Sequence, residues 1–268
     1  MTKPAGVIAV INRKGGVGKS TLSHALAFTL KRSFLTFPEL EDQMLRPTVA
    51  INHMDLVNKD RSRYSLSGRG YNVFCNTSEW RTFLQARVNA GELNRLVAIL
   101  DTGANDHGSI HNLGGAISQY VVPIMIGTEE DMLEKTLDTI RYLERDLGAS
   151  DKISTVINSV PGATRDYDRL FSRERTQDIV NHPKIGPRLL KGVTQSLSVA
   201  DICDRKVGPL TLPVVTGAVN AMYPMVSELV YRMRLPVRLQ TERDIRVMAA
   251  ESERRNRMDR STPDSAAA

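Results

Sequence analysis

Short apolar runs alternate along this chain with segments whose apolar residues recur at helical spacing. Runs bounded by turn residues and separated by helical patterns predict βαβ crossovers. The expected fold class is therefore α/β, with a doubly wound, mostly parallel sheet and helices on both faces. The candidate strands are Gly6–Ile11, Ser33–Phe37, Tyr71–Cys75, Leu96–Leu100, Tyr120–Ile126, Ile153–Val160 and Leu212–Thr216.

Four segments are predicted to be helices. The clearest is Glu129–Leu147, which has leucine or isoleucine along one face, acids in its first turn and Gly148 placed to end it. The others are Ser20–Lys31, Ser78–Ala90 and Ala221–Arg234. The intervening segment Asp55–Gly70 is polar and basic, and we expect it to be an exposed excursion.

The first strand runs directly into residues 14–21, Lys-Gly-Gly-Val-Gly-Lys-Ser-Thr, and these open a helix. This is the context of a phosphate-binding loop, in which backbone N–H groups and a helix N-terminus surround phosphate oxygens. Lys19 is placed to reach the β- and γ-phosphates, and we expect it to face solvent without nucleotide. The Ser20 hydroxyl is placed to ligate Mg²⁺. The residues expected to bind nucleotide here are Gly15, Gly16, Val17, Gly18, Lys19, Ser20 and Thr21.

The spelling of this loop is unusual, because Arg13 stands where the standard pattern has glycine and Lys14 precedes two glycines. The form Lys-Gly-Gly-x-Gly-Lys-[Ser/Thr] resembles the ParA/MinD family of ATPases. The resemblance spans about residues 5–235 and implies a P-loop ATPase domain over residues 1–240. It also implies that Lys14 crosses a dimer interface to the partner's nucleotide. The charged composition of residues 241–268 predicts a C-terminal helix and a disordered tail.

A carboxylate follows the apolar run Leu96–Leu100, at Asp101. Such an acid at a strand end suits a Mg²⁺ partner, and the stretch resembles the family's Walker B segment, with Pro123 in a later Val-Pro strand. Asp101 is therefore expected to act with Ser20 around Mg²⁺ and ATP. Asn158, at another strand end, is either an adenine-recognising residue by resemblance or an ordinary turn residue.

The family's catalytic Asp-x-Asp-Pro-Gln segment has a weaker counterpart at residues 38–43, Pro-Glu-Leu-Glu-Asp-Gln. The best register makes Glu41 the catalytic carboxylate, with Glu39 and Gln43 beside it. A glutamate is one methylene longer than aspartate, so the attacking water is displaced and hydrolysis is expected to be slow. The alternative is a solvated acidic loop.

Composition narrows the partners. A net charge of +6 permits a polyanionic partner, while 5% aromatic residues disfavour a stacking platform for single-stranded nucleic acid. Cys75 and Cys203 lack metal-ligand spacing and indicate a reduced, cytoplasmic protein. Neither a signal peptide, an apolar span of ~20 residues nor a MinD-type membrane helix is expected.

By resemblance, the function is an ATP-dependent switch with weak ATPase activity in plasmid partition or positioning. It would form a homodimer around two ATP molecules, bind DNA non-specifically and meet an adaptor or centromere-binding protein. The DNA contacts are expected from C-terminal arginines, namely Arg232, Arg234 and Arg238. The alternatives are an ATP-binding adaptor in plasmid stability or conjugation, a biosynthetic or metallochaperone ATPase, and a membrane-bound positioning factor.

Overall fold

Six strands form one parallel sheet in the order β3-β2-β4-β1-β5-β6. The computed structural model describes residues 3–33, 47–54, 70–104, 107–125, 131–158, 177–191 and 212–235. The strands are β1 (Gly6–Val10), β2 (Thr48–His53), β3 (Asn72–Phe74), β4 (Leu96–Asp101), β5 (Gln119–Ile124) and β6 (Ile153–Ile157). The predicted α/β fold class is confirmed.

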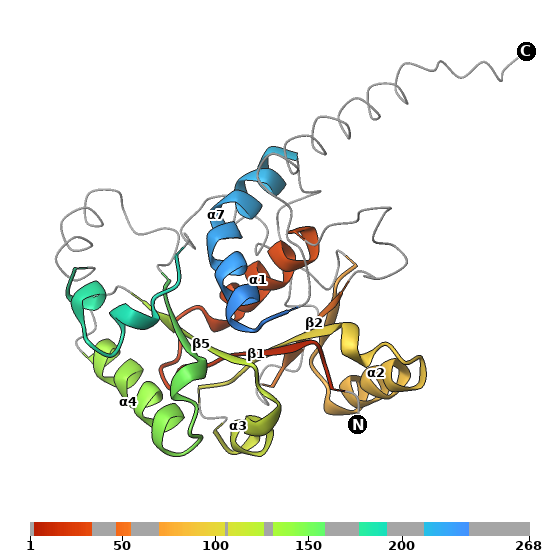
Figure 1. Ribbon diagram of the computed structural model, residues 1–268, viewed down its shortest axis with the longest axis horizontal. Helices are drawn as coiled ribbons and strands as arrows, with labels where there is room; N and C mark the ends of the chain where they lie inside the picture. Colours follow the sequence, from red (N-terminus) through yellow and green to blue (C-terminus); the bar gives the residue numbers. More distant parts are fainter. Residues whose placement is uncertain are drawn as a thin grey trace, which may run out of the picture.

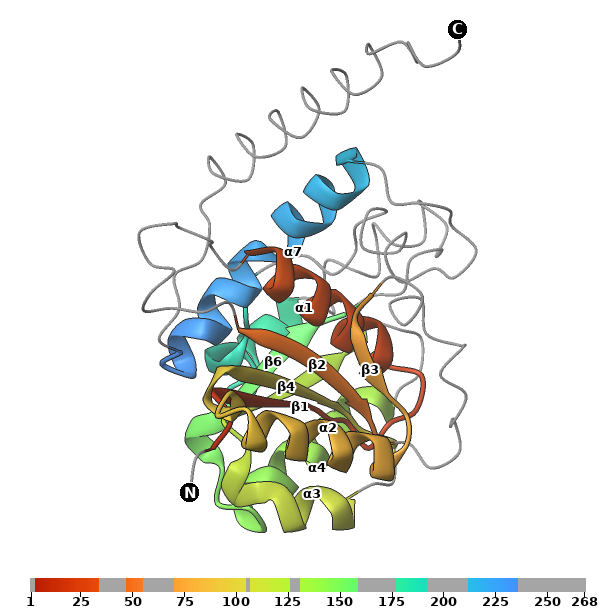
Figure 2. The same ribbon diagram turned by 90° about the vertical axis from the view of Figure 1, so that its right-hand side faces the viewer.

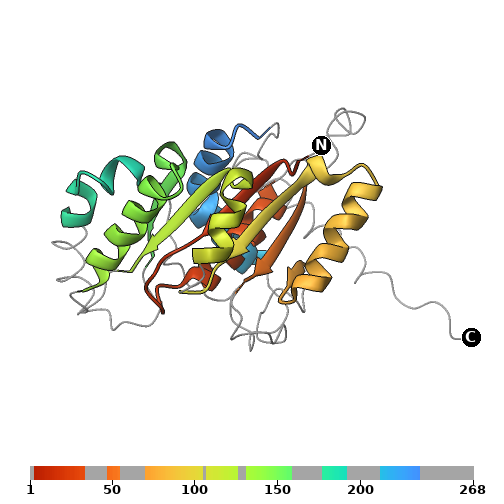
Figure 3. The same ribbon diagram turned by 90° about the horizontal axis from the view of Figure 1, so that it is seen from below.

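Helices cover both faces of this sheet (Figure 1). Helices α1 and α7 lie on one face and α2, α3 and α4 lie on the other, an arrangement that Figures 2 and 3 show from the side and from below. The helices are α1 (Lys19–Ser33), α2 (Thr77–Asn89), α3 (His107–Leu113), α4 (Asp131–Arg145) and α7 (Leu212–Arg232). No helix within the described ranges has the length and apolar character that a membrane crossing requires.

Alternate residues of the central strands supply two separate cores. In β1, Ile8 and Val10 pack towards α1 and α7, whereas Val7 and Ala9 pack on the opposite side. This division follows from the two-residue period of a strand. On α1, the three leucines recur at helical spacing and are all fully buried, namely Leu22, Leu26 and Leu30. The sheet is therefore sandwiched, and only its strand ends are available for chemistry.

One predicted strand, Leu212–Thr216, is wrong, and another, Ser33–Phe37, is contradicted at its first residue alone. Ser33 is the last residue of α1, and residues 34–37 lie outside the described ranges. The strand beside β4 is instead β2, which the apolar pattern did not single out. Residues 212–216 form the first turn of α7, in which Pro213 suits the first helical positions. The β-branched run that follows Pro213 suggested a strand, but packing of α7 on α1 overrides that propensity.

The remaining predicted elements agree with the structure to within a few residues, except that α7 begins nine residues before the predicted Ala221. Helix α4 is followed by Gly148 at a φ of +59°, as its predicted C-terminal role requires. Cys75 is buried, while Cys203 and the segments 55–69 and 241–268 lie outside the described residues.

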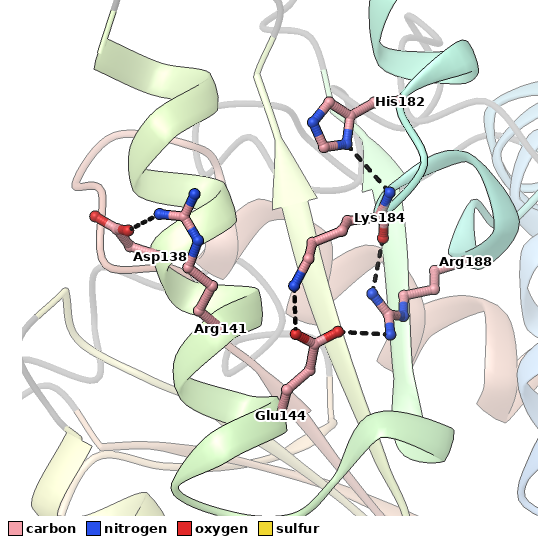
Figure 4. Close-up of polar contacts among 6 residues, drawn as sticks. All are labelled: Asp138, Arg141, Glu144, His182, Lys184 and Arg188. Atoms are coloured by element: carbon pink, nitrogen blue, oxygen red, sulfur yellow. Dashed lines mark hydrogen bonds and ion pairs between the residues drawn. The ribbon is translucent and has the colours of Figure 1, made fainter.

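The segment after β6 is tied back to α4 by one acidic side chain (Figure 4). Glu144 accepts hydrogen bonds from Lys184 Nζ at 2.7 Å and from Arg188 Nη2 at 2.8 Å. Hydrogen bonding to Lys184, and secondarily to Arg188, lowers the pKa of Glu144 below its ordinary value despite partial burial. Because both cations come from residues 177–191, this carboxylate fixes that segment against the α4 side of the sheet.

Candidate nucleotide site

The loop between β1 and α1 has a backbone that only glycine adopts easily. Gly16 and Gly18 have φ values of +74° and +77°. A Cβ atom on Gly18 would also lie 2.2 Å from Asn158 Nδ2, whereas one on Gly15 would meet nothing within 4 Å. Two of the three glycines are thus required by the loop itself, and Gly15 leaves space beside it.

Asn12, the residue before the loop proper, anchors it and was not anticipated from sequence. Its fully buried side chain donates from Nδ2 to Pro123 O at 2.9 Å and to Thr136 Oγ1 at 3.1 Å. Its Oδ1 accepts a hydrogen bond from Lys14 N at 2.8 Å. The loop start is therefore bound to β5 and α4 through one amide, which limits its freedom before any ligand arrives.

Arg13 occupies the position of the missing glycine without strain. Its φ is not positive, so no glycine is needed there. Its N–H donates to Thr139 Oγ1 at 3.0 Å, and its guanidinium carbon lies 5.2 Å from the centre of the Tyr142 ring. A cation over an aromatic face is stabilised electrostatically. The deviant spelling is therefore accommodated by docking onto α4.

Lys19 is not solvent-facing in this structure, contrary to the expectation from sequence. Only 8% of the residue is exposed. Its Nζ donates to Asn12 O at 3.1 Å and to Lys14 O at 3.0 Å. The ammonium is costly to bury without partners, and these carbonyl oxygens provide them. A bound phosphate would accept the same N–H donors of Lys19 Nζ in place of these two carbonyl oxygens.

Lys14 precedes Lys19 in the sequence and Ser20 follows it, and the two residues differ in their exposure to solvent. Lys14 is half-buried, and its backbone carries one contact to Asn12 and one to Lys19. Ser20 is exposed in the first turn of α1, and Thr21 after it is half-buried. An exposed serine at a helix N-terminus is compatible with the predicted role near phosphate and cation.

Asp101 ends β4 directly opposite Val10, the last residue of β1. Only 3% of Asp101 is exposed. Its Oδ2 lies 2.5 Å from His53 Nδ1, and His53 Nε2 lies 3.2 Å from His24 Nε2. Its Oδ1 is buried and has no hydrogen-bond partner among the described residues. An unsatisfied buried carboxylate oxygen is expensive, and a cation or water removes that cost.

The Asp101 Oδ1 atom, which has no partner among the described residues, is suited to bind Mg²⁺. Mg²⁺ prefers oxygen ligands and is commonly held by one or two carboxylates together with substrate phosphates. The described residues contain no group of three or more His, Cys, Asp or Glu side chains able to hold a metal by themselves. Asp101 and Ser20 therefore fit a Mg²⁺ ion that takes its other ligands from a bound nucleotide.

Asn158 directly follows β6, and its side chain contacts the loop between β1 and α1. Its Nδ2 donates to Val17 O at 2.9 Å and to Gly18 O at 3.3 Å, while its backbone N donates to Ile124 O at 2.7 Å. The side chain is almost fully buried. In this arrangement its amide acts on the phosphate loop, which is a different role from the adenine recognition that the resemblance implied.

Replacing Asn158 with alanine should separate these two roles. Loss of the amide leaves the Val17 carbonyl without that donor, which costs about 1–3 kcal/mol of folding free energy. Asn158→Asp should cost more, because a carboxylate would face carbonyl oxygens. Urea unfolding of the nucleotide-free protein is the measurement. If both variants unfold like the parent and lose only ATP affinity, adenine recognition is the correct role and the clasp on the loop is incidental.

The acidic segment predicted to hold the catalytic carboxylate lies outside the described residues. Glu41, with Glu39 and Gln43, was placed after a strand at residues 33–37, where Ser33 in fact ends α1. The polar residues that the structure does bring beside Asp101 come from the end of β2, above all His53. The role of Glu41 thus stays a prediction.

Comparison with protein-family models and with curated proteins finds no match. The fold does match solved structures. Cell division protein MinD of Aquifex aeolicus superimposes with a TM-score of 0.53 at 15% identity, covering 84% of this chain and 97% of MinD. A chain of the MinC:MinD cell division complex from the same organism gives 0.52 at 15% identity, with 84% and 96% covered.

A putative plasmid partition protein from Borrelia burgdorferi B31, bound to AMPPNP, matches with a TM-score of 0.51 at 17% identity. The match covers 84% of this chain and all (100%) of that one. At such identities the likeness establishes the fold. The chain thus has the doubly wound P-loop fold of MinD and of this partition protein, and the resemblance first read from residues 14–21 is confirmed at that level.

Proposed function

We propose that the chain is a molecular switch that binds Mg²⁺ and ATP at the loop after β1 and hydrolyses ATP slowly. One observation carries the proposal. Asp101 is buried, its Oδ1 has no hydrogen-bond partner in the described part of the chain, and it lies opposite the last residue of β1, after which the glycine-rich loop begins. Ligands of open α/β sheets bind outside the carboxyl ends of the strands, which is where these groups meet.

Different residues of the chain are proposed to bind the phosphates, to hold Mg²⁺ and to keep the loop in shape. Backbone N–H groups of the glycine-rich loop and the N-terminus of α1 bind phosphate oxygens. The Lys19 ammonium exchanges its loop carbonyl partners for the β- and γ-phosphates and stabilises charge as water attacks the γ-phosphate in line. Ser20 and Asp101 would hold Mg²⁺, which neutralises charge on the phosphates when bound. Asn12 and Asn158 keep the loop in shape for this.

Lys14 is proposed to act between two copies of the chain. Its backbone is fixed by Asn12, while the residue itself is half-exposed beside the glycines. A lysine so placed would reach the phosphates of a nucleotide held by a second copy. The result is a homodimer assembled on two ATP molecules, with hydrolysis as the step that releases it.

The task of such a switch is proposed to be partition or positioning of DNA or another cargo. The matched putative partition protein is bound to AMPPNP, and one matched MinD structure is a complex with MinC. The fold therefore accommodates a nucleotide and a protein partner in those proteins. For this chain we propose an adaptor or centromere-binding protein as partner, and non-specific duplex DNA as the surface that it travels on.

The basic residues near the end of α7 are not equivalent for DNA binding. The Arg232 guanidinium pairs with Glu228 and donates to Ser154 Oγ at 2.9 Å, so it is engaged within the fold. Arg234 is exposed, at a φ of +52°. Arg238 lies outside the described residues. Arg234 is thus the better candidate for a phosphate contact.

Duplex DNA binding should require ATP, fall with salt and weaken in Arg234→Gln. Each phosphate contact adds about 0.9 to the salt slope of log K, and a dimer doubles the contacts. Arg81→Gln, on α2 at the opposite face of the sheet, is the matched control. Fluorescence anisotropy at two salt concentrations, with ATP and without nucleotide, measures the effect. Absence of binding in both states would refute the DNA role and leave a nucleotide-gated protein contact.

A further inference from the structure

Three buried polar side chains from three elements form a continuous contact behind the candidate Mg²⁺ site. They are His24 of α1, His53 of β2 and Asp101 of β4, and each is 3% exposed. His53 Nδ1 lies 2.5 Å from Asp101 Oδ2, and its Nε2 lies 3.2 Å from His24 Nε2. The two imidazoles meet edge to face at 63°, with ring centres 5.3 Å apart.

The charge of His24 decides which atoms donate and which accept in the contacts between His24, His53 and Asp101. Burial, and then repulsion from His53, lowers the pKa of His24 to about 3, so its ring is neutral at physiological pH. An ionised Asp101 can only accept, which makes His53 Nδ1 a donor. The two Nε2 atoms must then share a single hydrogen bond, one donating and the other accepting. Every link is thereby satisfied in one arrangement of the rings.

The contact leaves Asp101 with two unlike oxygens. Oδ2 is occupied by His53, whereas Oδ1 is buried without a partner among the described residues. A carboxylate held through one oxygen cannot rotate freely about its last bond, and it presents the other oxygen at a fixed place. Partners that orient ligating carboxylates in this way commonly govern metal affinity.

We propose that His53 is a positioning residue that holds Asp101 so that Oδ1 alone faces Mg²⁺, and that His24 in turn fixes the His53 ring. The inference rests on the proposed function, which it deepens. His24 lies on α1, the helix that begins at Lys19. The same helix therefore carries the phosphate-binding lysine at its start and the support for the Mg²⁺ carboxylate one turn later. Helix α1 thereby fixes the position of Asp101 relative to the phosphate loop.

The alternative interpretation is that these three side chains only satisfy one another's hydrogen-bonding groups in the core. Both interpretations predict that removing His53 lowers stability, since it leaves Asp101 Oδ2 buried and unpaired. Only the positioning role predicts a specific loss of the Mg²⁺ effect on nucleotide binding. It also predicts rescue by His53→Asn, whose amide N–H can replace the Nδ1 donor.

The test measures the affinity for a fluorescent ATP analogue in Mg²⁺ and in EDTA. The result is the ratio of the affinity in Mg²⁺ to the affinity in EDTA. In His53→Ala this ratio should fall about 10-fold or more, in keeping with losses of supporting hydrogen bonds at metal ligands. His53→Asn should restore most of it. Ser23→Ala removes a neighbouring buried hydroxyl of α1 without touching Asp101, and should match the parent.

A parent-like ratio in folded His53→Ala, or a loss in His53→Asn equal to that in His53→Ala, would overturn the positioning role. If His53→Ala does not fold, His24→Ala decides, because it leaves the His53–Asp101 contact in place but unsupported. A reduced ratio there supports the proposal and an unchanged ratio overturns it. A parent protein whose nucleotide affinity is insensitive to Mg²⁺ would instead contradict the proposed function itself.

Discussion

Replacing Lys19 with alanine is expected to lower ATP affinity at least about 100-fold. Hydrogen bonds to charged groups are worth about 1.5–3 kcal/mol each, and 1.4 kcal/mol is a factor of about ten in affinity. Lys19 Nζ now makes two contacts with loop carbonyl oxygens, and it would exchange them for contacts with phosphate. Loss of two charge-assisted contacts therefore accounts for the expected size.

The measurement is isothermal titration with ATP, accompanied by thermal unfolding of each variant. Lys31→Ala is the matched control, because Lys31 lies in the last turn of the same helix, where its Nζ donates to Gly70 O at 3.1 Å. That control should bind ATP like the parent. Lys19→Ala should also be somewhat less stable, since its own loop contacts are lost. Unchanged ATP affinity in folded Lys19→Ala would remove the site.

Asp101→Asn should reduce Mg²⁺-dependent ATP turnover by about 100-fold or more, since a metal's charge stabilisation is worth several kcal/mol. The asparagine is isosteric and can still accept from His53, so the fold should persist. Binding of ATP in EDTA should change little. Asp138→Asn, in an exposed pair with Arg141 on α4, is the control and should have no effect.

Turnover assays with saturating ATP and graded Mg²⁺ measure this effect. Parent-like turnover in Asp101→Asn would show that Asp101 is not the Mg²⁺ carboxylate. A parent protein that binds ATP tightly but turns none over would favour the adaptor alternative, in which nucleotide binding alone gates a partner.

The glycine-rich loop between β1 and α1 was predictable because its sequence pattern is local. Eight consecutive residues carry the glycines, the lysines and the hydroxyl, and the flanking strand and helix follow from short-range apolar patterns. What holds the loop was not predictable. Asn12 is bound by Pro123 and Thr136, more than a hundred residues later, and no local pattern links such positions.

The second strand was missed for a related reason. Residues 33–37 and 212–216 have the aromatic or β-branched composition of strands, but Ser33 continues α1 and Leu212 begins α7. The true β2 is a short run at residues 48–53, and pairing with β4 rather than composition makes it a strand. Missing β2 concealed His53, and a lone histidine in α1 gave no reason to single out His24.

We propose that nucleotide at this loop switches the chain between two states of association. Light scattering of the parent and of Lys14→Ala, with Mg²⁺ and a non-hydrolysable ATP analogue or without nucleotide, measures this switch. We expect a monomer without nucleotide and a doubled mass with the analogue. Lys14→Ala should bind the analogue yet stay monomeric, while Lys14→Arg keeps the charge and should dimerise. One unchanged mass for the parent under both conditions would contradict it.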